Sequence, residues 1–137
     1  ELLQACDIVL VADDVRLADN HSNFAMVPGG GGSQRLPRLI GRQRALAHIL
    51  TGERIGAAEA VALGLAYRAV PAADLDAAAD ALAATLAAKD RAALARTKAL
   101  VHDGLALPLD DALALERRTV VEHLTSAGAM DAFARKG

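Results

Sequence analysis

The chain has 137 residues, of which 53% are hydrophobic and only 2% aromatic, and its formal net charge is −2. This length is enough for a core of alanine, leucine and valine, which favours helices, and the weak charge gives no reason to expect nucleic acid or a membrane surface as partner. Cys6 is the only cysteine. It excludes an intrachain disulfide, fits a reducing, cytoplasmic location and has no Cys or His companion at metal-ligand spacing, so we expect no metal.

The chain begins at Glu1 without a Met and inside an apolar periodic segment, so we expect it to be a piece of a longer protein. Residues 8–12 are a continuous apolar run that predicts a strand buried on both faces, and residues 16–18 predict a second short strand. Residues 19–24 form a polar loop that carries His21. Two strands do not make a stable sheet, so further strands must come from upstream or from another chain.

Four glycines at positions 29–32 follow Pro28 and lead into a predicted helix over residues 33–40, with Ser33 as its N-cap. Glycines permit positive φ and close approach of the backbone. The first N–H groups of a helix attract an anion or a polarised carbonyl. Taken alone, the run also fits a flexible linker or a plain surface loop, and the residues on either side decide between them.

The rest of the chain has a helical period, interrupted by an extended segment over residues 65–70. The fold class is therefore α/β, mostly helical with two or three short strands. We divide it into residues 1–70, an α/β part, and residues 71–137, a helical part. The predicted helices are 42–50, 57–63, 74–86, 91–102, 108–124 and a last short one that contains Met130 and Phe133.

Four motifs occur in a set order along the chain: ELLQACDI at 1–8, VPGGGGSQRLPRLIG at 27–41, LTGERI with AAEAVALGL at 50–65, and MDAFARK at 130–136. In this order they resemble the motifs of the crotonase family, the enoyl-CoA hydratases and isomerases. The resemblance covers nearly the whole chain and argues against the linker interpretation of the glycines. It implies the C-terminal part of a crotonase-like spiral of ββα units, followed by helices that drive trimer formation.

The resemblance also implies a substrate and partners. The substrate is an acyl-CoA thioester, no separate cofactor is needed, and the assembly is a homotrimer or a dimer of trimers. The family's oxyanion-hole amides and much of its coenzyme A site precede the position of Glu1, so we expect the isolated chain to be inactive.

Two residues match the positions of the family's catalytic pair. Glu1 matches the first catalytic glutamate, which acts as a base on water. His21, seven residues before Pro28, occupies the position of the second glutamate and departs from the family pattern. A histidine can replace a carboxylate in proton transfer, but it leaves the reaction open. The alternatives are an inert terminal residue and a loop histidine without a role.

The resemblance implies binding residues as well. Pro28, Gly29 and Gly30 match positions near the acyl chain and the thioester, and Phe133 and Lys136 match positions that contact the adenine and phosphates of coenzyme A. The alternatives are turn geometry for the glycines and a solvated terminal helix for the last two residues.

The function expected from these residues is that of an enoyl-CoA hydratase or isomerase. The thioester is held in an oxyanion hole, and Glu1 and His21 transfer protons. Two alternatives stay open: a different reaction on the same fold, such as C–C hydrolysis or isomerisation, and a non-catalytic oligomerising domain.

Overall fold

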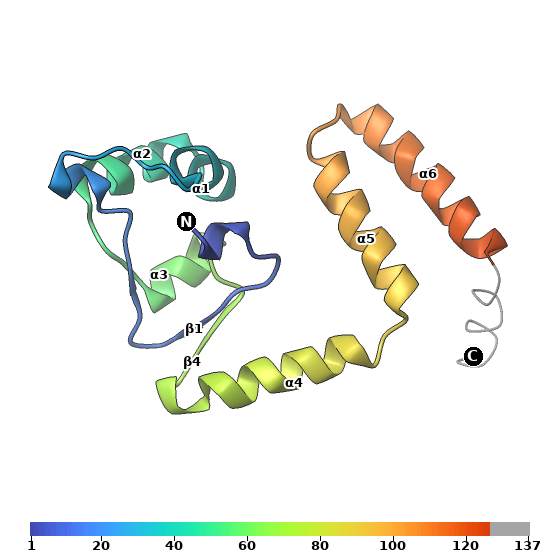
Figure 1. The fold of residues 1–137 in the computed structure, drawn as a ribbon, viewed down its shortest axis with the longest axis horizontal. Coiled ribbons are helices and arrows are strands. Elements are labelled where there is room, and N and C mark those ends of the chain that lie inside the picture. Colours follow the sequence, from blue (N-terminus) through green and yellow to red (C-terminus); the bar gives the residue numbers. More distant parts are fainter. Residues whose placement is uncertain (127–137) are drawn as a thin grey trace. The chain divides into compact units, whose positions relative to one another are not determined.

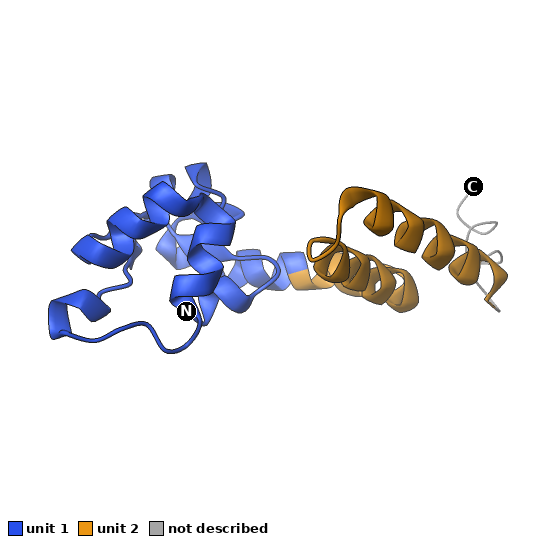
Figure 2. Ribbon diagram, turned by 90° about the horizontal axis from the view of Figure 1, so that it is seen from above, with its two compact units in different colours: residues 1–82 blue, residues 83–137 orange. Residues whose placement is uncertain are grey.

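The computed structural model describes residues 1–126. The chain forms two compact units, Glu1–Leu82 and Ala83–Gly137, which Figure 2 shows in different colours. All strands among the described residues belong to the first unit, and the elements described in the second unit are helices. The expected α/β fold, mostly helical with short strands, is confirmed.

Two small sheets lie in the first unit. Strand β1 (Leu10–Ala12) pairs in parallel with β4 (Arg68–Val70), as Figure 1 shows, and β2 (Arg16–Leu17) pairs antiparallel with β3 (Ile55–Gly56). The strands predicted near residues 8–12 and 16–18 are therefore confirmed. Strand β3 was not predicted, because two residues are too few to carry an alternating pattern.

The expectation that residues 8–12 are buried on both faces is wrong. Only Val11 is buried within β1, its neighbours are half-buried, and Ile8 is 43% exposed. Burial thus alternates along the strand, as it does where the core packs against one face only.

The helices of the first unit follow the predicted order. They are α1 (Gly32–Ile40), α2 (Arg42–Thr51) and α3 (Ala57–Ala62), with the short 3-10 helices η1 (Leu3–Ala5), η2 (His21–Phe24) and η3 (Ala72–Asp74). Helix α2 buries Ala45 and His48, whereas Leu46 and Leu50 are exposed. The spacing of its apolar residues had predicted that they all face the core, and this prediction is wrong for Leu46 and Leu50.

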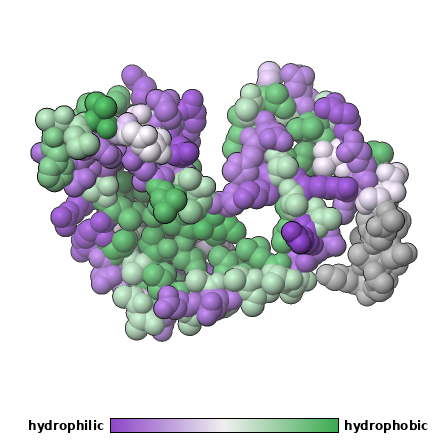
Figure 3. Space-filling model, viewed as in Figure 1, coloured by the Kyte–Doolittle hydropathy of each residue, from purple (hydrophilic) through white to green (hydrophobic). Residues whose placement is uncertain are grey.

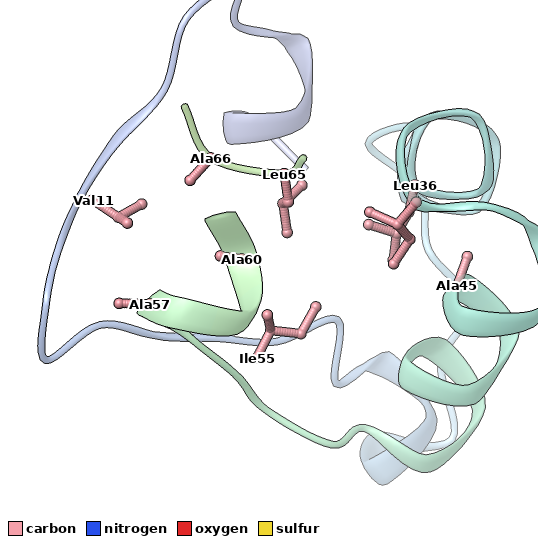
Figure 4. Close-up of a cluster of buried hydrophobic side chains, with 9 residues drawn as sticks. Val11, Leu36, Ala45, Ile55, Ala57, Ala60, Leu65 and Ala66 are labelled. Atoms are coloured by element: carbon pink, nitrogen blue, oxygen red, sulfur yellow. The ribbon is translucent and has the colours of Figure 1, made fainter. Parts of the chain in front are cut away.

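The core of the first unit is built from small and branched side chains of β1, α1, α2, β3, α3 and the segment that follows α3. Figure 4 shows them converging from β1, α1, α2, β3 and α3. Alanines bring backbones close together where larger side chains would hold them apart, which suits a chain with so few aromatic residues. The buried hydrophobic residues are Val11, Leu36, Ile40, Ala45, Ile55, Ala57, Ala60, Leu65 and Ala66.

The start of α1 differs from the prediction. Gly31, with φ of +103°, is the N-cap, and no side chain caps the helix, so the assignment of Ser33 as N-cap is wrong. A left-handed conformation at this position is accessible to glycine without strain, which explains why the glycine run ends at the first turn of the helix. Ser33 lies inside that first turn and accepts a hydrogen bond from the side-chain amide of Gln34.

Helix α4 (Leu75–Ala87) crosses the boundary between the units, and α5 (Arg91–Gly104) and α6 (Leu109–Thr125) pack side by side in the second unit. The Asp90 carboxylate accepts the N–H of Ala93 and caps α5. These helices confirm the predicted ones, and among the described residues no helix has the length and apolarity needed to traverse a bilayer. The predicted last helix, with Met130 and Phe133, lies outside the described residues.

Candidate active site

The glycine run surrounds the side chain of Glu1. The N–H groups of Gly30 and Gly32 both donate to Oε1 of Glu1, each at 2.9 Å. The anion that the start of α1 attracts is therefore a carboxylate of the same chain. With Oε1 occupied twice, Oε2 is the oxygen that remains to face a reacting group.

These contacts hold the pKa of Glu1 below its ordinary value. The largest cause is the N–H of Gly32, to which the N–H of Gly30 and the nearby His21 add, while partial burial opposes the shift. Hydrogen bonds and positive charge both favour the ionised form of a carboxyl group. These contacts therefore favour the carboxylate form of Glu1.

His21 lies at the start of η2 and faces Glu1. Its Nε2 is 3.9 Å from Oε2 of Glu1, so the two residues that were predicted from the family pattern are brought together. The other ring nitrogen, Nδ1, is 2.7 Å from Oδ1 of Asp19. The imidazole therefore lies between two carboxyl groups, one partly exposed and the other buried.

Asp19 was not predicted from the sequence. Its side chain is only 4% exposed, and its second oxygen, Oδ2, has no hydrogen-bond partner among the described residues. The signal was present in the sequence as an acidic residue two positions before His21, but nothing in the polar loop indicated that its side chain would be buried. The site is thus a cluster of three titratable groups and not a pair.

Glycine at position 32 is required by both carboxylates. A Cβ on Gly32 would lie 2.6 Å from Oδ2 of Asp19 and 3.1 Å from Oε1 of Glu1, and a Cβ on Gly30 would lie 2.6 Å from Oε2 of Glu1. Real Cβ atoms do not approach oxygen so closely. The predicted close approach of the glycine backbone is therefore observed, and it is made to side chains of the same chain.

Arg35 fixes the loop from the other side. Its guanidinium donates to the carbonyl oxygen of Gly30 at 2.7 Å and lies where a side chain at Gly31 would point. The loop is thus held by a charged donor on α1 as well as by the carboxylate of Glu1, which keeps the two donating N–H groups in place.

A small cavity of about 80 Å³ adjoins the acidic cluster. Three of its lining residues, Gln4, Asp19 and His48, carry buried side-chain atoms without a hydrogen-bond partner among the described residues. His48, from α2, also approaches Glu59, with Nε2 3.7 Å from Oε1.

The predicted binding residues are only partly described by the structure. Gly30 lies against Glu1, and a Cβ added at Gly29 would meet no atom within 4 Å, so the backbone there borders open space. Pro28 is half-buried beside it. Phe133 and Lys136 lie outside the described residues. The binding roles of all five stay predictions.

The arrangement of strands and helices is that of the crotonase fold, as solved structures show. An enoyl-CoA hydratase structure from Bacillus anthracis matches it with a TM-score of 0.88 at 33% identity, over 97% of this chain and 53% of that one. A structure from Thermobifida fusca, assigned to the enoyl-CoA hydratases and solved with acetoacetyl-CoA, matches at 0.84 and 38% identity, over 88% of this chain and 48% of that one.

The family described as enoyl-CoA hydratase/isomerase matches residues 1–137, and the chain belongs to this family. Among its relatives, YngF of Bacillus subtilis, assigned to the same enzymes, is 38% identical over 86% of this chain and 45% of its own length. The EchA8 protein of Mycobacterium leprae is 40% identical over 86% of this chain and 46% of its own length. The chain therefore spans about half the length of the relatives it matches, and the resemblance stated from the motifs is confirmed.

Proposed function

We propose that the protein containing this chain acts on acyl-CoA thioesters, and that Glu1 and His21 transfer the protons of the reaction. The relatives support the substrate class, since two structures from Thermobifida fusca were solved with acetoacetyl-CoA and with CoA. The observation that carries the proposal is the separation of 3.9 Å between Oε2 of Glu1 and Nε2 of His21.

This separation suits a water molecule held by both groups. An oxygen about 2.8 Å from each atom completes two hydrogen bonds of ordinary length. In hydration, that water forms a bond from its oxygen to the β-carbon of an α,β-unsaturated thioester and gives a proton to one of the two groups. The π electrons move to the thioester oxygen, and a proton then returns to the α-carbon, so that one water is added in total.

The carbonyl oxygen gains charge in this step and requires hydrogen-bond donors. Both N–H groups that approach Glu1 are occupied by it. We therefore assign the oxyanion hole to backbone amides outside this chain, in agreement with the family pattern, and assign to Pro28 and Gly29 the wall beside the acyl group.

A second candidate reaction follows from His21. The family pattern has a glutamate at this position, and here an imidazole is paired with a buried carboxylate. An imidazole can take and return a carbon-bound proton near neutral pH without addition of water. Isomerisation of the double bond is then the reaction in place of hydration, whereas C–C hydrolysis would still add one water across the bond that breaks.

The second unit supports an assembly role. Several apolar side chains of α5, α6 and the loop between them are exposed, as the surface colours of Figure 3 illustrate for this unit, and oligomerisation would remove such residues from water. The exposed residues are Leu94, Val101, Leu105, Leu107, Leu109, Leu113, Val120, Val121 and Leu124. We propose a homotrimer or a dimer of trimers, which light scattering coupled to size-exclusion chromatography measures directly.

The test of the proposed function is an assay of the complete gene product that contains this chain. Hydration of crotonyl-CoA is followed by the loss of absorbance of its conjugated thioester. We expect Glu1→Gln and His21→Gln each to lower kcat by about 10²–10⁴-fold, the usual contribution of one acid–base group. Glu53→Gln, which changes an exposed glutamate, is the matched control and keeps full turnover.

The outcomes separate the candidates. Unchanged turnover in Glu1→Gln refutes the assignment of Glu1 as the base. Turnover of a 3-enoyl-CoA without hydration favours the isomerase. A trimer that binds no acyl-CoA, measured by calorimetry with acetyl-CoA, refutes the catalytic proposal and leaves the oligomerising domain.

A further inference from the structure

His21 has two ring nitrogens, and the structure gives them different partners. Nδ1 lies 2.7 Å from Oδ1 of Asp19, a good hydrogen-bond distance, whereas Nε2 lies 3.9 Å from Oε2 of Glu1. An ionised carboxylate only accepts hydrogen bonds, so the proton of a neutral imidazole is on Nδ1 and the lone pair is on Nε2.

The burial of Asp19 makes its carboxylate depend on the hydrogen bond from His21. Its side chain is 4% exposed, and its other oxygen has no hydrogen-bond partner among the described residues. A buried carboxylate with a single donor depends on that donor, because a buried charge is costly unless it is paired. The imidazole of His21 is that donor, so loss of either residue leaves the other without its partner.

Asp19 is itself held by packing. Its Oδ2 lies against the backbone of Gly32, at the same glycine whose N–H donates to Glu1. The backbone at Gly32 thus contacts both carboxylates that flank the imidazole. Because Asp19 is buried against this backbone, its carboxylate has little room to turn away from His21.

We propose that Asp19 is the positioning residue of this site: it holds Nδ1–H of His21 and presents the lone pair of Nε2 toward Glu1. This inference rests on the proposed function in that His21 transfers a proton of the substrate or of water. The acid–base machinery is then a Glu1–His21–Asp19 array, in which only Glu1 and His21 reach the reacting atoms.

The first test reads the tautomer and needs no substrate. The complete gene product is labelled with ¹⁵N-histidine, and the spectra are recorded at a pH at which the ring nitrogens show neutral imidazoles. The signals of His21 are those that disappear in His21→Gln. We expect the Nδ1–H tautomer in the wild type, whereas an unrestrained imidazole favours Nε2–H. A wild type with Nε2–H overturns the proposal without any variant.

The second test uses Asp19→Asn, which keeps the shape of the side chain and removes its charge, with Asp14→Asn in the exposed turn as matched control. We expect Asp19→Asn to shift the tautomer and to lower kcat by about 10- to 100-fold, while the Kd for acetyl-CoA stays unchanged. Asp14→Asn changes none of these. An unchanged tautomer in Asp19→Asn overturns the proposal. If the wild type turns over enoyl-CoA, a shifted tautomer in Asp19→Asn with the kcat of the wild type overturns it as well.

The two proposals fail in different ways. If the wild type turns over no enoyl-CoA but Asp19→Asn shifts the tautomer, the hydratase and isomerase assignments fail while the positioning of His21 by Asp19 stands.

Discussion

The substitution Gly32→Ala tests the geometry of the site through a single methyl group. Its Cβ would lie 2.6 Å from Oδ2 of Asp19, 3.1 Å from Oε1 of Glu1 and 3.2 Å from Cγ of Glu1. The backbone at this position is not in the left-handed region, so alanine adds no backbone strain. The destabilising part of the effect therefore comes from the collision with the side chains of Asp19 and Glu1.

The magnitude follows from two opposing effects. Forcing a methyl group into a packed site costs about 1–3 kcal/mol, and Asp19 is too buried to move aside freely. Replacing glycine by alanine in a helix raises the free energy of unfolding by up to about 1 kcal/mol, because alanine favours the helix. We expect a net loss of about 1–2 kcal/mol in the free energy of unfolding, measured by urea denaturation, and a fall in kcat of at least about 10-fold, because both carboxylates move relative to His21.

The matched control is Gly29→Ala in the same glycine run. A Cβ there meets no atom within 4 Å, so we expect a change in stability within about 0.5 kcal/mol. If Gly32→Ala and Gly29→Ala have the same free energy of unfolding, the start of α1 does not pack against Glu1 and Asp19, and the reasoning is refuted.

Three further predictions concern the rest of the chain. The pKa of Glu1 is lower in the folded state than in the unfolded state, so the unfolded state binds more protons between the two pKa values. The free energy of unfolding therefore falls as the pH drops through these values. Measured by urea denaturation from pH 7 to pH 3, this fall should be smaller in Glu1→Gln than in the wild type. Leu36→Ala, at a residue only 2% exposed, should cost about 2–5 kcal/mol, whereas Leu39→Ala on the exposed side of α1 should cost far less; equal losses by urea denaturation would contradict the described core. Asp90→Ala removes the cap of α5 and should lower the free energy of unfolding by about 1 kcal/mol, whereas Asp90→Asn, which can still cap the helix, should keep most of the stability. Equal melting temperatures of the two variants would rule out the cap.

Much of the fold could be predicted from the sequence because its signals are local. The period of the helices, the stop at Gly41 and the start of α6 after Pro108 depend on residues next to one another. Strand β3 could not be predicted, since two residues become a strand only through their pairing with β2. Nor could the burial of β1, which depends on how much of the strand the core covers.

The site divides in the same way. The register of Glu1 and His21 was readable because the glycine run sets the spacing of the motifs. The role of Asp19 was not, since only the folded chain shows that its carboxylate is buried and which nitrogen of His21 it meets. The N-cap failed for a related reason: a serine was expected where the left-handed conformation of Gly31 already begins the helix.

The burial of Asp19 also constrains how this sequence can change. A glutamate at position 21, the residue typical of the family, would place a third carboxylate between Asp19 and Glu1, and like charges at such distances disfavour one another. We therefore expect His21→Glu alone to destabilise the site, and Asp19→Asn made together with it to relieve the repulsion, because it removes one of the three charges.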